Sequence, residues 1–162
     1  MKRILAVAAI LSVTVCACVK NAGSSQTVTC TNVEPYAEQS QILAFLSVHN
    51  LSFNKDTSGV YYRIDTVGTG NSATITSTVS FTYVASLLDG SIIDKSTTPI
   101  TYPLASTIPG FGKMAGYFKT GTHIKLVIPS SLAYGCEGLV SGTIGVPANA
   151  ILYYDLVITA VQ

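Results

Sequence analysis

Two stretches of this chain alternate apolar and polar residues with the period of a β-strand, and they restrict the fold more than any other feature. The first places one set of side chains on a single face: Val79, Phe81, Tyr83, Ala85 and Leu87. The second does the same with Leu152, Tyr154, Leu156 and Ile158. Because successive side chains of a strand point to opposite faces, each stretch predicts a strand with one buried side.

Shorter runs predict the remaining strands. "VYYRIDTV" at 60–67, "PITYPL" at 99–104 and "HIKLVIP" at 123–129 are rich in β-branched and aromatic residues. Asp89-Gly90 is a signal for a hairpin turn, and "SIID" after it begins the returning strand. The glycine-rich and serine-rich stretch after residue 129 predicts a long loop. The sequence therefore predicts five or six antiparallel strands.

Two apolar stripes have the period of a helix instead. The later stripe, at i, i+3, i+4 and i+7, consists of Phe111, Met114, Ala115 and Phe118. Glycines weaken this short helix, so packing against the sheet must hold it. The earlier stripe predicts an N-terminal helix from about Glu34-Pro35 to about His49-Asn50, with Ile42, Leu43, Phe45 and Leu46 on its apolar side. Together these elements indicate the α+β class.

The N-terminus has the features of a lipoprotein signal peptide. Lys2 and Arg3 precede an apolar run at 4–15, which is shorter than the roughly 20 residues of a membrane-spanning helix. The next residues, "VCAC", resemble a bacterial lipobox, in which a small residue, here Ala17, precedes a lipidated cysteine, here Cys18. We therefore expect a signal peptide at 1–17. A plain signal peptide cleaved nearby and an uncleaved anchor are the alternatives.

Composition divides the rest of the chain into three parts. Residues 18–33 are small and polar, as expected of a tether, and residues 34–58 form an accessory helical segment. Residues 59–162 hold the predicted sheet and its short helix, which together make one domain of ordinary size. Only 10% of the chain is charged, with a formal net charge of +1, and no basic patch indicates a nucleic-acid partner.

Two cysteines remain after the predicted cleavage and lipidation. Cys30 and Cys136 form an even pair in a chain that we expect to reach an oxidising compartment, so we predict a disulfide between them. A reactive thiol and a metal ligand are the alternatives. A metal site is the poorer one, because His49 and His123 have no ligand spacing with either cysteine.

Three motifs in the second half of the chain resemble those of the FKBP-type peptidyl-prolyl cis-trans isomerases. They are "YVASLLDGSIID" at 83–94, "IPGFGKMAGYFKTGTHIKLVIPSSLAYG" at 108–135 and "VPANAILYYDLVI" at 146–158. Their order and spacing match the family from about Gly59 to Val161, whereas the segment before Gly59 is not part of the resemblance. The resemblance implies a half-barrel, in which a strongly curved antiparallel sheet wraps one short helix around an aromatic pocket.

The resemblance also implies which residues form that pocket. The catalytic positions are Tyr83, Asp94, Ile108 and Tyr134, with a Tyr83–Asp94 hydrogen bond and a substrate carbonyl bound by the Ile108 N–H and the Tyr134 hydroxyl. The substrate-binding positions are Ile93, Ile100, Tyr102, Thr107, Phe111, Val146 and Tyr154. Each of these also has a plainer interpretation, as a core aromatic, a packing residue or, for Asp94, a solvated turn carboxylate.

Three of these positions depart from the family pattern. Ile93 and Tyr154 stand where the family has phenylalanine, and Phe111 stands where it has tryptophan. The hydroxyl of Tyr154 on an apolar floor costs free energy unless it is hydrogen-bonded, so we expect a bond to Asp94, Tyr83 or a trapped water.

The resemblance implies an isomerase that acts on X-Pro bonds of exported proteins and needs no metal or other cofactor. A non-catalytic binding module or chaperone of the cell envelope is the alternative, and an inert structural lipoprotein is a third hypothesis. The expected partners are proline-containing polypeptides and a membrane reached through the lipid anchor. We expect a monomer in a Gram-negative-type envelope, in the outer membrane and facing the periplasm.

Overall fold

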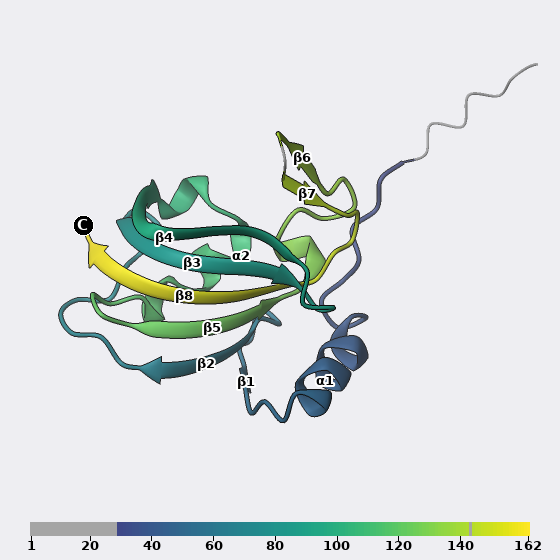
Figure 1. Cartoon of the computed structure of the whole chain (residues 1–162), viewed down its shortest axis with the longest axis horizontal. Coiled ribbons are helices and arrows are strands. Elements are labelled where there is room, and N and C mark those ends of the chain that lie inside the picture. Colours follow the sequence, from purple (N-terminus) through teal and green to yellow (C-terminus); the bar gives the residue numbers. More distant parts are fainter. Residues whose placement is uncertain (1–28, 143) are drawn as a thin grey trace, which may run out of the picture.

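A six-stranded antiparallel sheet is the main element of the computed structural model, which describes residues 29–142 and 144–162. The predicted signal peptide at 1–17 and the lipidation of Cys18 lie outside the described residues. The strand order is β1-β2-β5-β8-β3-β4, and the sheet curves around helix α2 (Figure 1). The bounds of its strands are β1 Asn54–Lys55, β2 Tyr61–Thr66, β3 Thr78–Leu87, β4 Ile92–Pro103, β5 His123–Ile128 and β8 Leu152–Val161.

The two alternating stretches of the sequence become the neighbouring strands β3 and β8. They pair antiparallel, with Ala85 opposite Tyr154 and Tyr83 opposite Leu156. The runs "SIID" and "PITYPL" belong to one strand, β4, whose register with β3 shifts twice. Pro99 is tolerated inside β4 because this strand lies at the edge of the sheet, where a missing N–H breaks no ladder.

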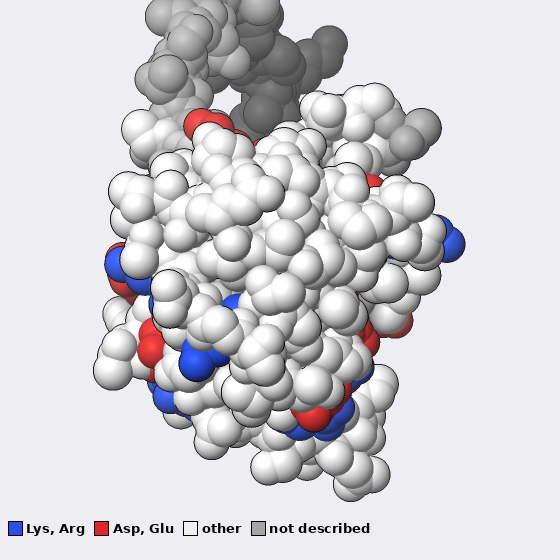
Figure 2. Space-filling view, turned by 90° about the vertical axis from the view of Figure 1, so that its left-hand side faces the viewer, with Lys and Arg blue, Asp and Glu red and all other residues white. Residues whose placement is uncertain are grey.

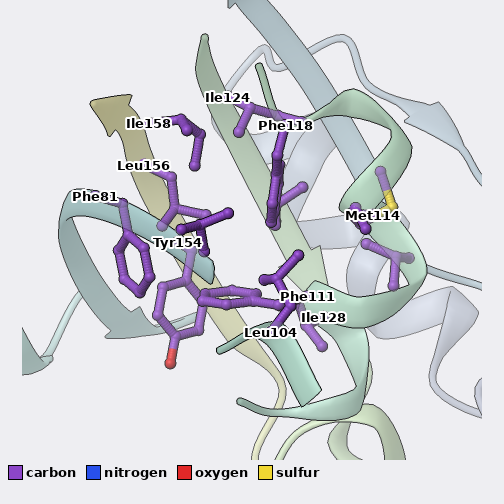
Figure 3. Close-up of a cluster of buried hydrophobic side chains, with 14 of the residues drawn as sticks. Phe81, Leu104, Phe111, Met114, Phe118, Ile124, Ile128, Tyr154, Leu156 and Ile158 are labelled. Carbon is purple, nitrogen blue, oxygen red and sulfur yellow. The ribbon is translucent and has the colours of Figure 1, made fainter. Parts of the chain in front are cut away.

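The main core lies between the sheet and the helical segment formed by α2 (Pro109–Met114) and the 3₁₀ turn η2 (Ala115–Tyr117) (Figure 3). The whole predicted stripe is buried: Phe111, Met114, Ala115 and Phe118. A Cβ on Gly110 would lie 2.6 Å from a methyl of Ile128, so a glycine here allows α2 to lie close to β5. The α+β class, the curved antiparallel sheet and its short helix are therefore confirmed.

Helix α1 (Gln39–Val48) packs on a second, smaller apolar cluster. Its buried residues Ile42 and Leu46 contact Val127 of β5, whose neighbours in the strand point into the main core instead. The helix ends at Val48 with His49 as its C-cap, close to the predicted end, but it starts later than predicted, because residues 35–38 form a turn. Leu43 is 47% exposed, so its predicted place on the buried stripe was wrong, whereas Ile42, Phe45 and Leu46 pack on the smaller cluster as predicted.

The stretch predicted as one long loop after β5 has local structure of its own. It contains the 3₁₀ turn η3 (Ser130–Leu132) and a hairpin of β6 (Leu139–Ser141) with β7 (Ile144–Val146). A third 3₁₀ turn, η1 (Leu104–Ser106), precedes α2. Within residues 29–142 and 144–162, no helix has the length and apolar character to cross a membrane. On the face drawn in Figure 2, charged side chains are few and of both signs.

The predicted disulfide is present between Cys30 and Cys136, whose Cα atoms are 5.6 Å apart. It joins the segment before α1 to the loop that follows η3. In Figure 1 this segment runs beside that loop and then continues into α1.

Candidate active site

One pocket of about 450 Å³ opens between the sheet, the start of α2 and the β6–β7 hairpin. It brings together every residue that the resemblance assigned to the site: Tyr83, Ile93, Asp94, Ile100, Tyr102, Thr107, Ile108, Phe111, Tyr134, Val146 and Tyr154. These residues are spread over more than 70 positions of the chain, and the curvature of the sheet is what makes them neighbours.

Three aromatic rings form the floor. The Phe111 ring meets Tyr154 edge-on at a centroid distance of 4.9 Å and Phe81 at 5.9 Å, with interplanar angles of 73° and 87°. Edge-to-face contacts of this kind place the positive edge of one ring on the negative face of another. In Figure 3 the rings pack together while the hydroxyl oxygen of Tyr154 points away from the buried cluster. The floor is thus rigid, apolar and of fixed shape.

The structure forms no hydrogen bond from the Tyr154 hydroxyl to Asp94 or Tyr83, the protein partners expected for it, within the described residues. Burial raises the pKa of Tyr154, and the nearby hydroxyls of Tyr134, its hydrogen-bond partner, and of Tyr83 raise it further. The hydroxyl therefore stays protonated and neutral at physiological pH.

Tyr83 and Asp94 interact at one side of the pocket. The Tyr83 hydroxyl donates to Asp94 Oδ2, while Asp94 Oδ1 accepts the N–H of Lys95 at 2.8 Å. Burial raises the pKa of Tyr83, and the hydrogen bond to the carboxylate raises it further. The bond fixes the Tyr83 ring, which lies 6.1 Å from that of Tyr154 between centroids, at the pocket wall.

Ile108 lies at the pocket edge, immediately before α2. Pro109 occupies the first turn of that helix and favours the extended conformation observed at Ile108 (φ −59°, ψ 145°). The preceding Thr107 is held by its own hydroxyl, which donates to the carbonyl of Leu104 at 2.7 Å. The Ile108 N–H makes no hydrogen bond to another described residue, so this donor is available to a ligand in the pocket.

Tyr134 enters the pocket from the loop between η3 and the hairpin. Its ring is half-buried, and burial raises the pKa of its hydroxyl. A protonated hydroxyl at neutral pH can donate to a carbonyl oxygen. Together with the Ile108 N–H it supplies a second donor at the pocket.

Six lining residues were not predicted: Phe81, Ser106, Pro109, Ala133, Leu139 and Ile144. Phe81 could have been found, because strand alternation places it on the same face as Tyr83. Leu139 and Ile144 come from the β6–β7 hairpin, which the sequence did not predict. No group of three or more His, Cys, Asp or Glu side chains is placed to hold a metal in the described part of the chain.

Residues 70–159, more than half of the chain, match the FKBP-type peptidyl-prolyl cis-trans isomerase family. The chain belongs to this family. The match includes the whole pocket and excludes α1 and the segment before it. The resemblance drawn from the three motifs is therefore confirmed at the level of the family.

Curated relatives of this FKBP-family chain include proteins named FKBP-type peptidyl-prolyl cis-trans isomerase FkpA. The one from Aeromonas hydrophila is 35% identical over 108 residues, which cover 65% of this chain and 39% of the relative. The one from Escherichia coli K12 is 36% identical over 101 residues, which cover 60% and 36%. The chain thus spans about two fifths of the length of the curated relatives it matches.

Solved structures agree on the fold. The crystal structure of FkpA from Escherichia coli aligns with a TM-score of 0.68 at 27% identity, covering 79% of this chain and 61% of that one. A peptidyl-prolyl cis-trans isomerase from Pseudomonas syringae aligns with a TM-score of 0.65 at 29% identity, covering 82% of this chain and 98% of that one.

Proposed function

We propose that this chain is a peptidyl-prolyl cis-trans isomerase that acts on X-Pro bonds of exported proteins and assists their folding in the cell envelope. The observation that carries the proposal is the pocket, in which one apolar cavity is lined by every residue assigned from the family motifs. The proposal rests equally on the family match, which spans the pocket completely.

The isomerisation makes and breaks no covalent bond, so the catalyst only has to favour the twisted amide over the planar one. Rotation about a peptide bond has a barrier of roughly 18–20 kcal/mol because resonance stiffens the C–N bond. For X-Pro bonds the cis and trans forms are close in energy but exchange only over tens of seconds or longer. The twisted amide has lost that resonance, so its carbonyl is less polarised. A site that favours this state over the planar amide accelerates the exchange.

The pocket has the properties that this chemistry needs. The aromatic floor of Phe81, Phe111 and Tyr154 suits a pyrrolidine ring and removes water, which would favour the planar, polar amide. The Ile108 N–H and the Tyr134 hydroxyl then hold the flanking chain in the orientation that allows rotation. No nucleophile, metal or redox group takes part in these steps.

A prolyl-isomerisation assay with several residues before proline tests the proposal. Tyr134→Phe and Asp94→Ala are each expected to lower kcat/KM roughly tenfold, since each removes a hydrogen bond worth about 1–1.5 kcal/mol. Asp89→Ala is the matched control: this carboxylate lies in the same hairpin but is exposed, and among the described residues its hydrogen-bond partner is Ser91, outside the pocket. Asp89→Ala is expected to leave kcat/KM unchanged.

Two outcomes contradict the proposal in different ways. If the wild-type chain is folded but does not accelerate isomerisation, the enzymatic function is wrong. If it is active and both pocket variants match the wild type, the function stands but the site is wrongly assigned.

We further propose that the chain is a monomer anchored by lipid at Cys18 to the outer membrane, facing the periplasm, with proline-containing polypeptides as its substrates. The lipobox-like "VCAC" and the apolar run at 4–15 support the anchor. The Cys30–Cys136 disulfide supports an oxidising compartment. Incorporation of labelled palmitate in cells, lost in Cys18→Ser, is the measurement that checks the anchor.

The second candidate function is a non-catalytic module that binds extended or unfolded chains. It is favoured by the edge of the pocket, where Tyr102 is 49% exposed, and by the altered positions Ile93 and Tyr154. Suppressed aggregation of an unfolded, proline-free client by a chain that shows no isomerisation would favour this function over the first.

A further inference from the structure

Glu38 is a buried carboxylate in the segment that precedes α1. Its side chain is only 6% exposed, although it belongs to a part of the chain outside the family match. Both carboxylate oxygens are used by one residue: the Ser130 N–H donates to Oε2 at 2.8 Å, and the Ser130 hydroxyl donates to Oε1 at 2.5 Å. A buried carboxylate is costly unless it is hydrogen-bonded, and hydrogen bonds to a carboxylate are strong. These two bonds therefore hold Glu38 and Ser130 together.

Ser130 in turn hydrogen-bonds the backbone on both sides of Tyr134. Ser130 is itself fully buried, and its carbonyl accepts the N–H of Ala133 at 2.9 Å and the N–H of Gly135 at 2.8 Å. These two residues flank Tyr134 on either side. Glu38 therefore holds the one residue whose carbonyl fixes the backbone on both sides of the Tyr134 ring.

Asn32 of the same segment makes a second contact with this loop. Its Oδ1 accepts the N–H of Cys136 at 2.9 Å. Asn32 also lies against Gly135, where a Cβ would overlap the Asn32 amide. The φ of Gly135 is +58°, which glycine adopts without strain, so this position needs glycine for two reasons. The loop that carries Tyr134 is thus held from residues 30–38, not only from the sheet.

We propose that Glu38 is a positioning residue of the pocket, which sets the place of the Tyr134 hydroxyl through Ser130. This inference rests on the proposed function, because it assigns Glu38 to the same isomerase site. Glu38 does not touch the substrate; it acts through Ser130 and the loop. The segment at 30–38 then helps to position a catalytic residue, although it lies outside the family match.

The test compares Glu38→Ala, Glu38→Gln and the control Gln39→Ala in the full-length chain. Glu38→Ala removes both contacts with Ser130, and we expect kcat/KM to fall roughly tenfold, as misplaced catalytic groups cause. Glu38→Gln keeps an acceptor for the Ser130 N–H and a group for its hydroxyl, so it is expected to restore most of the activity. Gln39→Ala removes the hydrogen bond from Lys55 at the start of the same helix, at 2.7 Å, without touching the loop.

A second readout does not depend on catalysis. In Glu38→Ala we expect the amide hydrogens of Ala133 and Gly135 to exchange at least tenfold faster and the Tyr134 ring signals to shift, with no such change in Gln39→Ala. If Glu38→Ala does not fold, Ser130→Ala takes its place as the milder variant: it removes the hydroxyl contact with Glu38 but keeps the Ser130 N–H and carbonyl, and the amides of Ala133 and Gly135 remain the reporters.

The outcomes separate this inference from the proposed function. A wild-type chain without activity would contradict the function, yet faster exchange around Tyr134 in Glu38→Ala would still support the positioning role. An active wild type with Glu38→Ala equally active and equally protected would overturn the role of Glu38 alone. Equal losses in Glu38→Ala and Gln39→Ala would also overturn it, since they would reflect general loosening of α1.

Discussion

At the scale of single residues, the three departures from the family pattern change the pocket in different ways. Phe111 keeps an aromatic floor, with edge-on contacts to both Phe81 and Tyr154. Ile93 replaces a flat ring by a branched aliphatic group at the wall. Tyr154 adds a hydroxyl to a side chain that is only 7% exposed. Of the three, Tyr154 introduces a polar group where the rest of the floor is apolar.

Replacing Tyr154 by phenylalanine is therefore expected to raise the free energy of unfolding, by up to about 1 kcal/mol. The Tyr154 hydroxyl is buried, and among the described residues the Tyr134 hydroxyl interacts with it as a hydrogen-bond partner, so its removal is expected to relieve more desolvation cost than the interaction it loses. Chemical denaturation of Tyr154→Phe and wild type measures the difference.

Tyr153→Phe is the matched control for this prediction. It removes a hydroxyl from the adjacent position of β8, on the opposite face, where the ring packs against Phe45 and Phe53. A loss of more than about 1 kcal/mol in Tyr154→Phe, absent from Tyr153→Phe, would show that the hydrogen bond of the Tyr154 hydroxyl outweighs its desolvation cost.

At the scale of elements, the β6–β7 hairpin contributes one wall of the pocket. Leu139 and Ile144 face the cavity, whereas Val140, next to Leu139, is 89% exposed. Adjacent residues of one short strand thus have opposite environments, so a substitution at Val140 is a matched control for one at Leu139.

Leu139→Ala is expected to lower kcat/KM roughly fivefold, whereas Val140→Ala leaves it unchanged. The loss follows from apolar contact with substrate: a fully enclosed methylene contributes about 1–3 kcal/mol, and the partly exposed Leu139 side chain is expected to contribute about 1 kcal/mol in all. The isomerisation assay on both variants checks the difference. Equal values for the two variants would mean that the hairpin does not contact the substrate.

Three strands also share a network of charges on the side of the sheet away from the pocket. Asp155 of β8 lies 2.6 Å from His123 Nε2 and accepts a hydrogen bond from Lys125, both of β5. Asp65 of β2 pairs with Arg63 at 2.6 Å and lies 3.8 Å from Lys125. Burial alone would raise the pKa of Asp155, but the hydrogen bonds from Lys125 and His123 outweigh it, and the pKa falls below the ordinary 3.8.

The lowered pKa of Asp155 gives the stability a defined dependence on pH. A carboxylate with a depressed native pKa contributes stability above its unfolded pKa and loses it as the pH falls through the native one. We therefore expect the free energy of unfolding to fall as the pH drops below about 4, and to fall less in Asp155→Asn. Urea unfolding at a series of pH values measures this. Glu137→Gln, an exposed carboxylate without an ion pair among the described residues, should keep the wild-type slope.

The elements that could be predicted are those whose pattern is local and long. Alternation over β3 and β8 and the stripe of α2 each repeat often enough to decide between strand and helix. The β6–β7 hairpin has strands of three residues amid glycines, too short for any period to appear. The same holds for Glu38, because nothing near it in sequence shows that a serine 92 positions later will bury it.

At the scale of the whole molecule, two apolar clusters lie on opposite sides of the sheet, and the smaller one joins the N-terminal segment to it. The larger one fills the concavity around α2, and the smaller one holds α1 against β2 and β5. The pocket borders the first cluster, and Ser130 of its Tyr134 loop is hydrogen-bonded to Glu38, which directly precedes the helix that packs on the second. Variants that loosen the packing of α1 on the sheet are therefore also expected to loosen the loop that carries Tyr134.

The Cys30–Cys136 disulfide is the covalent part of that attachment and closes a loop with a sequence separation of 106. A cross-link over such a distance restricts the unfolded chain, so its reduction is expected to lower the free energy of unfolding by up to about 4 kcal/mol. Denaturant unfolding with and without a thiol reductant measures the change. The double variant Cys30→Ser/Cys136→Ser should unfold like the reduced wild type and should not respond to reductant. Identical unfolding midpoints for oxidised and reduced wild type would show that the contacts of Glu38 and Asn32 hold the segment without the covalent bond.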